Sequence, residues 1–253
     1  MTKLGFQLYS ARNFPPFSEV FIKVAKAGYK EVEGYGAMYA ELDDSGLKSL
    51  RTELDRNGLA MPTGHFSIDM LEGEPNRALK IAKVLGVEAI YAPFLMPDHR
   101  PKTAEGWHDF GVRLQKISKP YREAGYDFGW HNHDFEFVKL EDGSLPIEQI
   151  LTGGPELSWE ADIAWVVRGG ADPLEWIERL GHRITAVHVK DIARAGEAAN
   201  EGGWADVGHG TLEWAKLMQL LRATNAKHYV VEHDNPSDLD RVVTRSIASF
   251  KTY

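Results

Sequence analysis

The sequence contains no cysteine among its 253 residues. This absence excludes a disulfide-stapled scaffold, a thiolate metal site and a cysteine nucleophile. There is no N-x-Ser/Thr sequon, and no apolar run approaches the roughly 18 residues of a candidate membrane span. The first ten residues lack the pattern of a signal peptide. We therefore expect a soluble, cytoplasmic protein with no membrane partner.

Basic residues are in the minority, with 29 Lys and Arg against 37 Asp and Glu, and the formal net charge is −8. No basic run could follow a phosphate backbone, so nucleic acid is not an expected partner. With 43% hydrophobic residues, the chain can bury one sizeable core. Its length suits a single barrel domain over residues 1–253.

A pattern of helix, glycine and strand repeats along the chain. Five amphipathic stretches end at a glycine that opens a β-branched or aromatic run, at Gly28, Gly58, Gly86, Gly125 and Gly181. The eight candidate strands cover residues 4–10, 29–35, 59–66, 87–94, 126–133, 155–162, 184–191 and 228–234. Eight alternating units predict the α/β class and a closed (β/α)8 TIM barrel. An open doubly wound sheet is the alternative, but the first strand lacks its glycine-rich phosphate turn.

Polar residues gather at the carboxyl ends of these strands, where such barrels place catalytic groups. They are Glu33, His65, His131, His133, Glu136, Glu160, Asp162, His188, Lys190, Glu232 and His233. A lone histidine there is commonly structural, but several that converge favour a metal site. Imidazole and carboxylate donors fit Mn²⁺, Zn²⁺, Mg²⁺, Co²⁺ or Fe²⁺ without selecting firmly among them.

Four strings at these strand ends are distinctive: WHNHDFEF at 130–137, EADIAW at 160–165, AVHVKD at 186–191 and VVEHD at 230–234. The opening LGFQLYSAR and the segment AGYKEVEGYG accompany them. Together they resemble the sugar phosphate isomerase/epimerase family of the xylose isomerase-like TIM-barrel superfamily, which also includes inosose dehydratase and endonuclease IV-type proteins. The resemblance spans nearly the whole chain. It is specific for the fold and the metal site, and loose for the substrate.

The resemblance implies one divalent metal ion, with Mn²⁺ as the first choice. Its ligands would come from the last four strands and would be Glu136, Asp162, His188 and Glu232. Because side chains alternate along a strand, His131 shares a face with His133 while Glu136 lies on the other. Glu136 therefore reaches the metal only if the chain bends near Asp134, and His131 is the substitute ligand.

Six residues are expected to contact a small carbohydrate substrate: Glu33, His65, His131, His133, Trp165 and Lys190. Lys190 follows His188 by two positions on one strand, so both side chains point into the same cavity. Relatives commonly carry Asp-x-x-His on the sixth strand, and Trp165 stands here in place of that histidine. Its indole could pack in the core or form an apolar wall for a sugar ring or aglycone.

The resemblance implies a metal-dependent isomerase or epimerase that acts on a keto sugar or sugar derivative through an enediolate. Glu136 and Glu232 would be the catalytic carboxylates, one removing a proton and the other returning it. An enediolate also expels a β-leaving group, so a lyase or dehydratase acting on a 3-keto sugar, keto-glycoside or keto-inositol is the alternative. A non-catalytic sugar-binding barrel would leave the four ligands without a purpose.

Two features allow two interpretations each. The string GHGT at 208–211 could hold an anion through its backbone N–H groups, although a simple turn before a helix is favoured. Barrels of this kind are commonly dimers or tetramers, so a homo-oligomer is expected. Four tryptophans could anchor its interface or pack in the core: Trp107, Trp176, Trp204 and Trp214.

Overall fold

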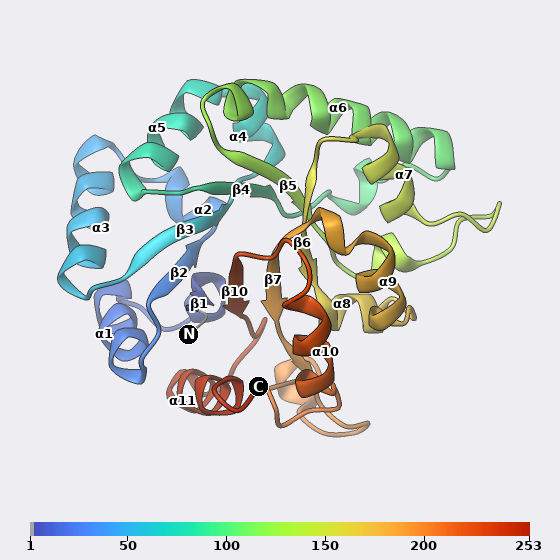
Figure 1. Ribbon diagram of the computed structural model, residues 1–253. Helices are drawn as coiled ribbons and strands as arrows, with labels where there is room; N and C mark the ends of the chain where they lie inside the picture. Colours follow the sequence, from blue (N-terminus) through green and yellow to red (C-terminus); the bar gives the residue numbers. More distant parts are fainter. Residues whose placement is uncertain (1–2) are drawn as a thin grey trace.

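The computed structural model describes residues 3–253, and eight parallel strands form a closed barrel inside a ring of helices (Figure 1). The barrel strands are β1 (Leu4–Gln7), β2 (Glu31–Gly34), β3 (Ala60–His65), β4 (Ala89–Ala92), β5 (Asp127–His131), β6 (Ser158–Asp162), β7 (Ile184–Val189) and β10 (His228–Val231). They follow one another around the barrel in chain order, and β10 pairs with β1 to close it. The barrel predicted from the sequence is confirmed.

Helices follow every barrel strand and cover the outside of the barrel (Figure 1). They are α1 (Phe17–Ala27), α2 (Gly36–Ala40), α3 (Asp44–Arg56), α4 (Ile68–Gly73), α5 (Pro75–Leu85), α6 (Ala104–Glu123), α7 (Pro146–Gly153), α8 (Ile163–Arg168), α9 (Pro173–Leu180), α10 (Trp214–Leu221) and α11 (Leu239–Phe250). Helix α11 shows why they pack there, because its apolar residues Val242, Val243 and Ile247 share one buried stripe. Its N-cap is Asp238, which accepts a hydrogen bond from the backbone N–H of Arg241.

The glycines that end the helices mostly behave as the sequence predicts. Gly28, Gly58, Gly86 and Gly125 all take positive φ angles, between +64° and +110°. The left-handed conformation turns the chain out of the helix and into the next strand. Gly181 was expected to do the same, but its φ is −55°. Here a 3-10 turn, Gly181–Arg183, leads from α9 into β7.

The inside of the barrel holds little apolar material. The main apolar core lies between strands and helices, whereas Ala89, Tyr91 and Ala186 form a separate small cluster. The Tyr91 hydroxyl lies 2.8 Å from Thr185 Oγ1. Polar side chains fill the space toward the carboxyl ends of the strands, so the barrel interior itself carries the candidate chemistry.

Two further features bear on the sequence predictions. A two-stranded hairpin, β8 (Asp191–Ile192) with β9 (Trp204–Ala205), follows β7 and was not expected. The four tryptophans considered as interface anchors all lie in the interior with 1–3% of their surface exposed. They therefore pack within the chain and cannot anchor a partner. Within residues 3–253, no helix is both long and apolar enough to span a membrane.

Close packing of α6 against α7 gives a test of the fold. A Cβ atom at Gly111 would overlap the carbonyl oxygen of Ile150, whereas one at Gly73 would meet nothing within 4 Å. We expect Gly111→Ala to lower the free energy of unfolding by about 1–3 kcal/mol, because overpacking forces the helices apart. Gly73→Ala, the matched control, should be neutral or stabilise by up to about 1 kcal/mol. Urea denaturation measures both, and equal effects would contradict the close approach.

Candidate active site

Seven buried polar side chains converge at the carboxyl end of the barrel. They come from six strands or the residues directly after them and are Glu33, His65, His131, Glu160, Asp162, His188 and Glu232. Their spacing follows from strand geometry, since Glu160 and Asp162 are two positions apart on β6 and both face inward. Sequence analysis placed Glu160 at this edge but gave it no role. Its two-residue spacing from Asp162 was the available signal.

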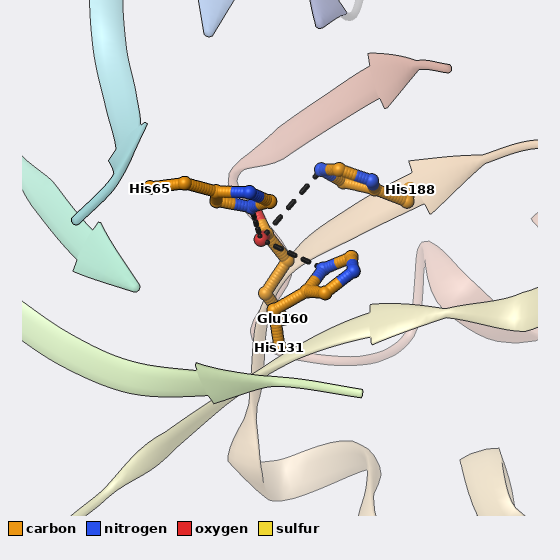
Figure 2. A group of neighbouring side chains, drawn as sticks. All are labelled: His65, His131, Glu160 and His188. Carbon is orange, nitrogen blue, oxygen red and sulfur yellow. Dashed lines mark hydrogen bonds and ion pairs between the residues drawn. The ribbon is translucent and has the colours of Figure 1, made fainter. Parts of the chain in front are cut away.

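Three imidazoles surround one carboxylate deep in the barrel, in a cluster we call the deep group: His65, His131, Glu160 and His188 (Figure 2). Glu160 Oε2 lies 2.6 Å from His65 Nε2, 3.1 Å from His131 Nδ1 and 3.6 Å from His188 Nε2. The four donor atoms all lie within 4.8 Å of one another. The three rings come from β3, β5 and β7, so the group ties non-adjacent strands together.

A second cluster, the outer group, lies one step nearer the strand ends and consists of His131, Asp162, His188 and Glu232. His188 Nδ1 lies 3.0 Å from Glu232 Oε2 and 3.9 Å from Asp162 Oδ2. One oxygen of Asp162, Oδ1, caps α8 by accepting from the N–H of Trp165. The other, Oδ2, is buried and has no hydrogen-bond partner among the described residues. This oxygen therefore lacks a hydrogen bond, although Lys190 Nζ lies 3.5 Å from it.

Among the described residues, 3–253, Lys190 is the only lysine that reaches the outer group. Its side chain is fully buried. Its Nζ lies 2.7 Å from Asp234 Oδ1, 3.1 Å from Glu232 Oε2 and 3.5 Å from Asp162 Oδ2. The ammonium also lies 4.2 Å from the ring centre of Trp204 and 4.9 Å from that of Trp165. Burial opposes its charge, but the three carboxylates raise the pKa above that of an ordinary lysine. Lys190 is therefore a fixed positive charge beside the outer group.

Burial and neighbouring charges set the protonation of the remaining groups. Burial raises the pKa of Glu160 to about 7 and that of Asp162 to about 6. Burial also opposes ionisation of Glu33, but the charges of His65 and His188 hold its pKa at about 2. For His188 the surrounding carboxylates outweigh burial and raise the pKa well above its usual value. A cation bound here would displace protons from these groups.

The donor set fits a divalent metal ion. Both groups combine buried imidazole nitrogens with carboxylate oxygens, and Asp162 Oδ2, Glu160 Oε1 and Glu33 Oε2 are buried without partners. Unpaired buried carboxylate oxygens are costly unless a cation satisfies them. Nitrogen and oxygen donors of this kind suit Mn²⁺, Fe²⁺, Co²⁺ or Zn²⁺.

Glu136, the residue preferred from the sequence as first metal ligand, lies outside both groups. Its Oε1 accepts a hydrogen bond from Trp130 Nε1 at 2.8 Å, and its Oε2 accepts one from the backbone N–H of His133 at 2.9 Å. The 3-10 turn Phe135–Phe137 turns its carboxyl group into this buried corner, where burial raises the pKa to about 8. The chain does bend after β5, but away from the outer group, and the substitute His131 takes that place.

A cavity of about 510 Å³ opens above the outer group. Of the predicted substrate contacts, His65, His131, His133 and Trp165 line it, as does Glu232. Glu33 and Lys190 do not line it. They contact residues of the outer group instead, Glu33 at His188 and Lys190 at Glu232. A hollow of about 660 Å³ lies at the opposite end of the barrel, around Glu31 and His228. Active sites of such barrels lie at the carboxyl ends of the strands, so the smaller cavity is the candidate site.

Several cavity residues were not expected from the sequence. They are Tyr9, Tyr35, Gly36, Ala37, Pro93, Phe94 and Asp234. Each follows a barrel strand by only a few residues, and this position was the signal that could have identified them. Asp234 in particular is the last residue of the VVEHD string, and its carboxylate pairs with Lys190.

The GHGT segment does not offer a free anion site. The carboxylate of Asp191 accepts hydrogen bonds from the backbone N–H groups of Ile192, Gly208, Gly210 and Leu212, at 2.9–3.2 Å. A side chain of the protein therefore occupies the donors that a phosphate would use. The interpretation as a structural turn is the one that the structure supports.

The chain is similar to known proteins in sequence and in structure. The family model described as xylose isomerase-like TIM barrel matches residues 21–253. No curated protein matches the sequence significantly. A sugar phosphate isomerase/epimerase from Parabacteroides distasonis is similar in structure, with a TM-score of 0.82 and 22% identity over 99% of this chain and 93% of that one.

Two further solved structures share the fold at lower identity. A probable 3-DHS dehydratase from Bacillus anthracis has a TM-score of 0.76 and 13% identity over 99% of each chain. The IOLI protein, solved with a zinc atom, has a TM-score of 0.75 and 15% identity over 99% of this chain and 97% of that one. At these identities the similarity establishes the fold, and the chemistry must be argued from the site.

The choice between His131 and Glu136 as a metal ligand can be tested by metal content. We expect His131→Ala to weaken metal binding by more than about 100-fold, because loss of even an indirect partner costs 10–100-fold. Glu136→Ala should retain the metal and instead lower the free energy of unfolding by about 1–3 kcal/mol, because Trp130 Nε1 and the N–H of His133 lose their acceptor. Mass spectrometry of dialysed protein gives the metal content. Metal loss in Glu136→Ala alone would reverse the assignment.

Proposed function

The chain belongs to the xylose isomerase-like TIM-barrel family, and we propose that it is a metal-dependent isomerase or epimerase of a keto sugar or sugar derivative. The observation that carries this proposal is the outer group, where two imidazoles and two carboxylates lie within 4.8 Å of one another at the floor of a cavity. A purely binding barrel has no need for such a set. The neighbour described as a sugar phosphate isomerase/epimerase supports the same class of reaction.

The outer group would hold the ion. When bound, a divalent ion there supplies positive charge that stabilises the oxygens of an enediolate. We propose Mn²⁺ as the first ion to test and Zn²⁺ as the second, since one structural neighbour is described with zinc. This assignment keeps Asp162, His188 and Glu232 from the sequence analysis and replaces Glu136 by His131.

Glu232 is the proposed base. Its Oε2 interacts with His188 Nδ1 and Lys190 Nζ, whereas Oε1 accepts no hydrogen bond from the described residues. Burial opposes its ionisation, but Lys190 and His188 lower the pKa well below its usual value. Glu232 therefore lines the cavity as a carboxylate with one oxygen available to take a proton from carbon.

His133 replaces Glu136 as the proposed second group in proton transfer. It lines the cavity from the segment just after β5, while Glu232 enters from the residue just after β10. Burial, with the nearby charge of Lys190, lowers the pKa of His133 to about 3, so its imidazole is neutral at neutral pH. Its Nδ1 has no hydrogen-bond partner in the described part of the chain. A neutral, unpaired imidazole can accept or relay a proton on the side away from Glu232.

A lyase or dehydratase acting on a 3-keto sugar, keto-glycoside or keto-inositol remains the second candidate. It uses the same first step, since Glu232 removes the proton next to the carbonyl and the electron pair then expels a β-substituent. The structural similarity to a probable 3-DHS dehydratase supports it. Product analysis separates the two, because only the second releases a leaving group.

The partners, the cellular location and the oligomeric state of the protein are also proposals. The net charge of −8 favours a small neutral or cationic ligand over nucleic acid. We retain the expectations of cytoplasmic location and of a homo-oligomer. The tryptophans now assigned to the core give the oligomer no anchor.

The proposed function is tested by proton exchange in D₂O with keto sugars, beginning with D-fructose. We expect Glu232→Gln to lower deuterium incorporation by about 100-fold or more, because an amide cannot accept the proton. Sugar affinity should change by less than about tenfold, since Gln keeps the shape and one metal-binding oxygen. Glu53→Gln, on α3 outside the cavity and paired with Arg56, is the matched control. Near wild-type exchange by metal-loaded Glu232→Gln would leave Glu232 as a ligand only.

The metal assignment has its own test. Purified protein should carry about one divalent ion per chain, and Asp162→Ala and His188→Ala should each lose it, because each removes a direct ligand. Full metal retention in both variants, with wild-type circular dichroism, would contradict the outer group as the metal site.

A further inference from the structure

Two aromatic walls rise from the polar floor of the cavity. We call Tyr9 and Tyr35 the tyrosine wall, and Phe94, His133 and Trp165 the mixed wall. The tyrosine wall follows β1 and β2, and the mixed wall follows β4, β5 and β6. In a barrel whose eight strands follow chain order, the first and second strands lie opposite the fifth and sixth. The two walls therefore face each other across the cavity that all five residues line.

The rings of each wall hold one another in place. Tyr9 and Tyr35 meet edge to face with centroids 5.5 Å apart. In the mixed wall, His133 lies 5.1 Å from Phe94 and 5.3 Å from Trp165. Such edge and tilted contacts fix ring orientation. The walls are therefore formed before any ligand arrives.

Three arginines lie beside wall rings, one at the tyrosine wall and two at the mixed wall. The guanidinium of Arg12 lies 3.9 Å from the centre of Tyr9, that of Arg100 lies 5.1 Å from Phe94, and that of Arg168 lies 5.4 Å from Trp165. None of the three lines the cavity, so they support the rings from outside it. Each of the three donates a hydrogen bond to a backbone carbonyl, Arg12 to Asp234, Arg100 to Leu95 and Arg168 to Gly202. Arg100 lies closer still to Phe135, at 3.5 Å, and Arg168 to Trp204, at 3.2 Å, so these two also support the rings next to the mixed wall.

Two of the wall rings stay partly exposed to solvent. Tyr9 and Phe94 are each 39% exposed, although both are large aromatic side chains. Exposed aromatic rings that border a concave site mark a surface for a ligand. Below them, His65, His131 and Glu232 give the floor its polar contacts. The cavity thus has a polar end suited to a sugar and an apolar, aromatic end suited to something else.

We infer that the substrate carries a second ring: a keto sugar in glycosidic linkage to an aromatic group, which lies between the two walls. This inference rests on the proposed function and narrows it, because the polar floor would hold the sugar and the walls would hold the aglycone. A cavity of about 510 Å³ falls within the range of about 300–1,000 Å³ for sites that enclose ligands of this size. Two opposed walls sandwich a flat ring, whereas one wall would suffice for a sugar face.

Calorimetric titration with two probes tests the inference. Phenyl β-D-glucopyranoside and methyl β-D-glucopyranoside share the sugar and differ in the ring. We expect the phenyl probe to bind about tenfold more tightly to the metal-loaded protein. Tyr35→Ala and Phe94→Ala should each reduce this preference by about threefold or more, whereas Tyr35→Phe and Phe94→Tyr, which keep the rings, should preserve it. Ile22→Ala, an exposed change on α1, is the control outside the cavity.

Equal affinities for the two probes, or no binding of either, would overturn the aromatic subsite. So would an unchanged preference in both alanine variants. The result is independent of the exchange experiment: a phenyl preference without proton exchange supports the subsite and rejects the proposed reaction. Proton exchange on D-fructose without a phenyl preference does the reverse.

Discussion

The imidazole of His188 is the contact on which the site depends. Its Nε2 lies 2.7 Å from Glu33 Oε1 on β2, and its Nδ1 lies 3.0 Å from Glu232 Oε2 after β10. One ring from β7 therefore joins carboxylates from the two strands that flank β1, and it belongs to both the deep and the outer group. The positive ring offsets part of their buried negative charge, together with His65 beside Glu33 and Lys190 beside Glu232. Buried polar side chains can fill the barrel interior because their carboxylates are paired with imidazoles such as His188.

The barrel could be predicted because its signals are local. Strand periodicity, amphipathic helices and a glycine at a helix end each act over a few residues, as Gly28 and Gly86 show. Gly181 does not take the predicted left-handed conformation, because a 3-10 turn joins α9 to β7 at this point. The β8–β9 hairpin depends on Asp191 binding backbone groups up to 21 residues away, a contact that no local pattern reveals.

The site residues on strands could likewise be predicted, whereas several in the segments after strands could not. Asp162 and His188 could be located because they lie on regular strands, where alternation decides which way a side chain points. Glu136 could not, since it lies beyond the strand end and its direction depends on hydrogen bonds to Trp130 and to the backbone of His133. Tyr35 and Phe94 lie in the segments after strands as well. Their meeting across the cavity is a property of the closed barrel and not of either segment.

The fixed ammonium of Lys190 has a consequence for how the protein matures. It neutralises Glu232 and Asp234 from within the chain, so the carboxylates do not need an ion in order to be buried together. Under the proposed function, the barrel can fold first and the ion would enter afterwards, as a late and reversible step. Mixed nitrogen and oxygen donors rank divalent ions by the general order of affinities more than by fit. The ion carried in the cell would then reflect which metal is in supply when the finished protein is loaded.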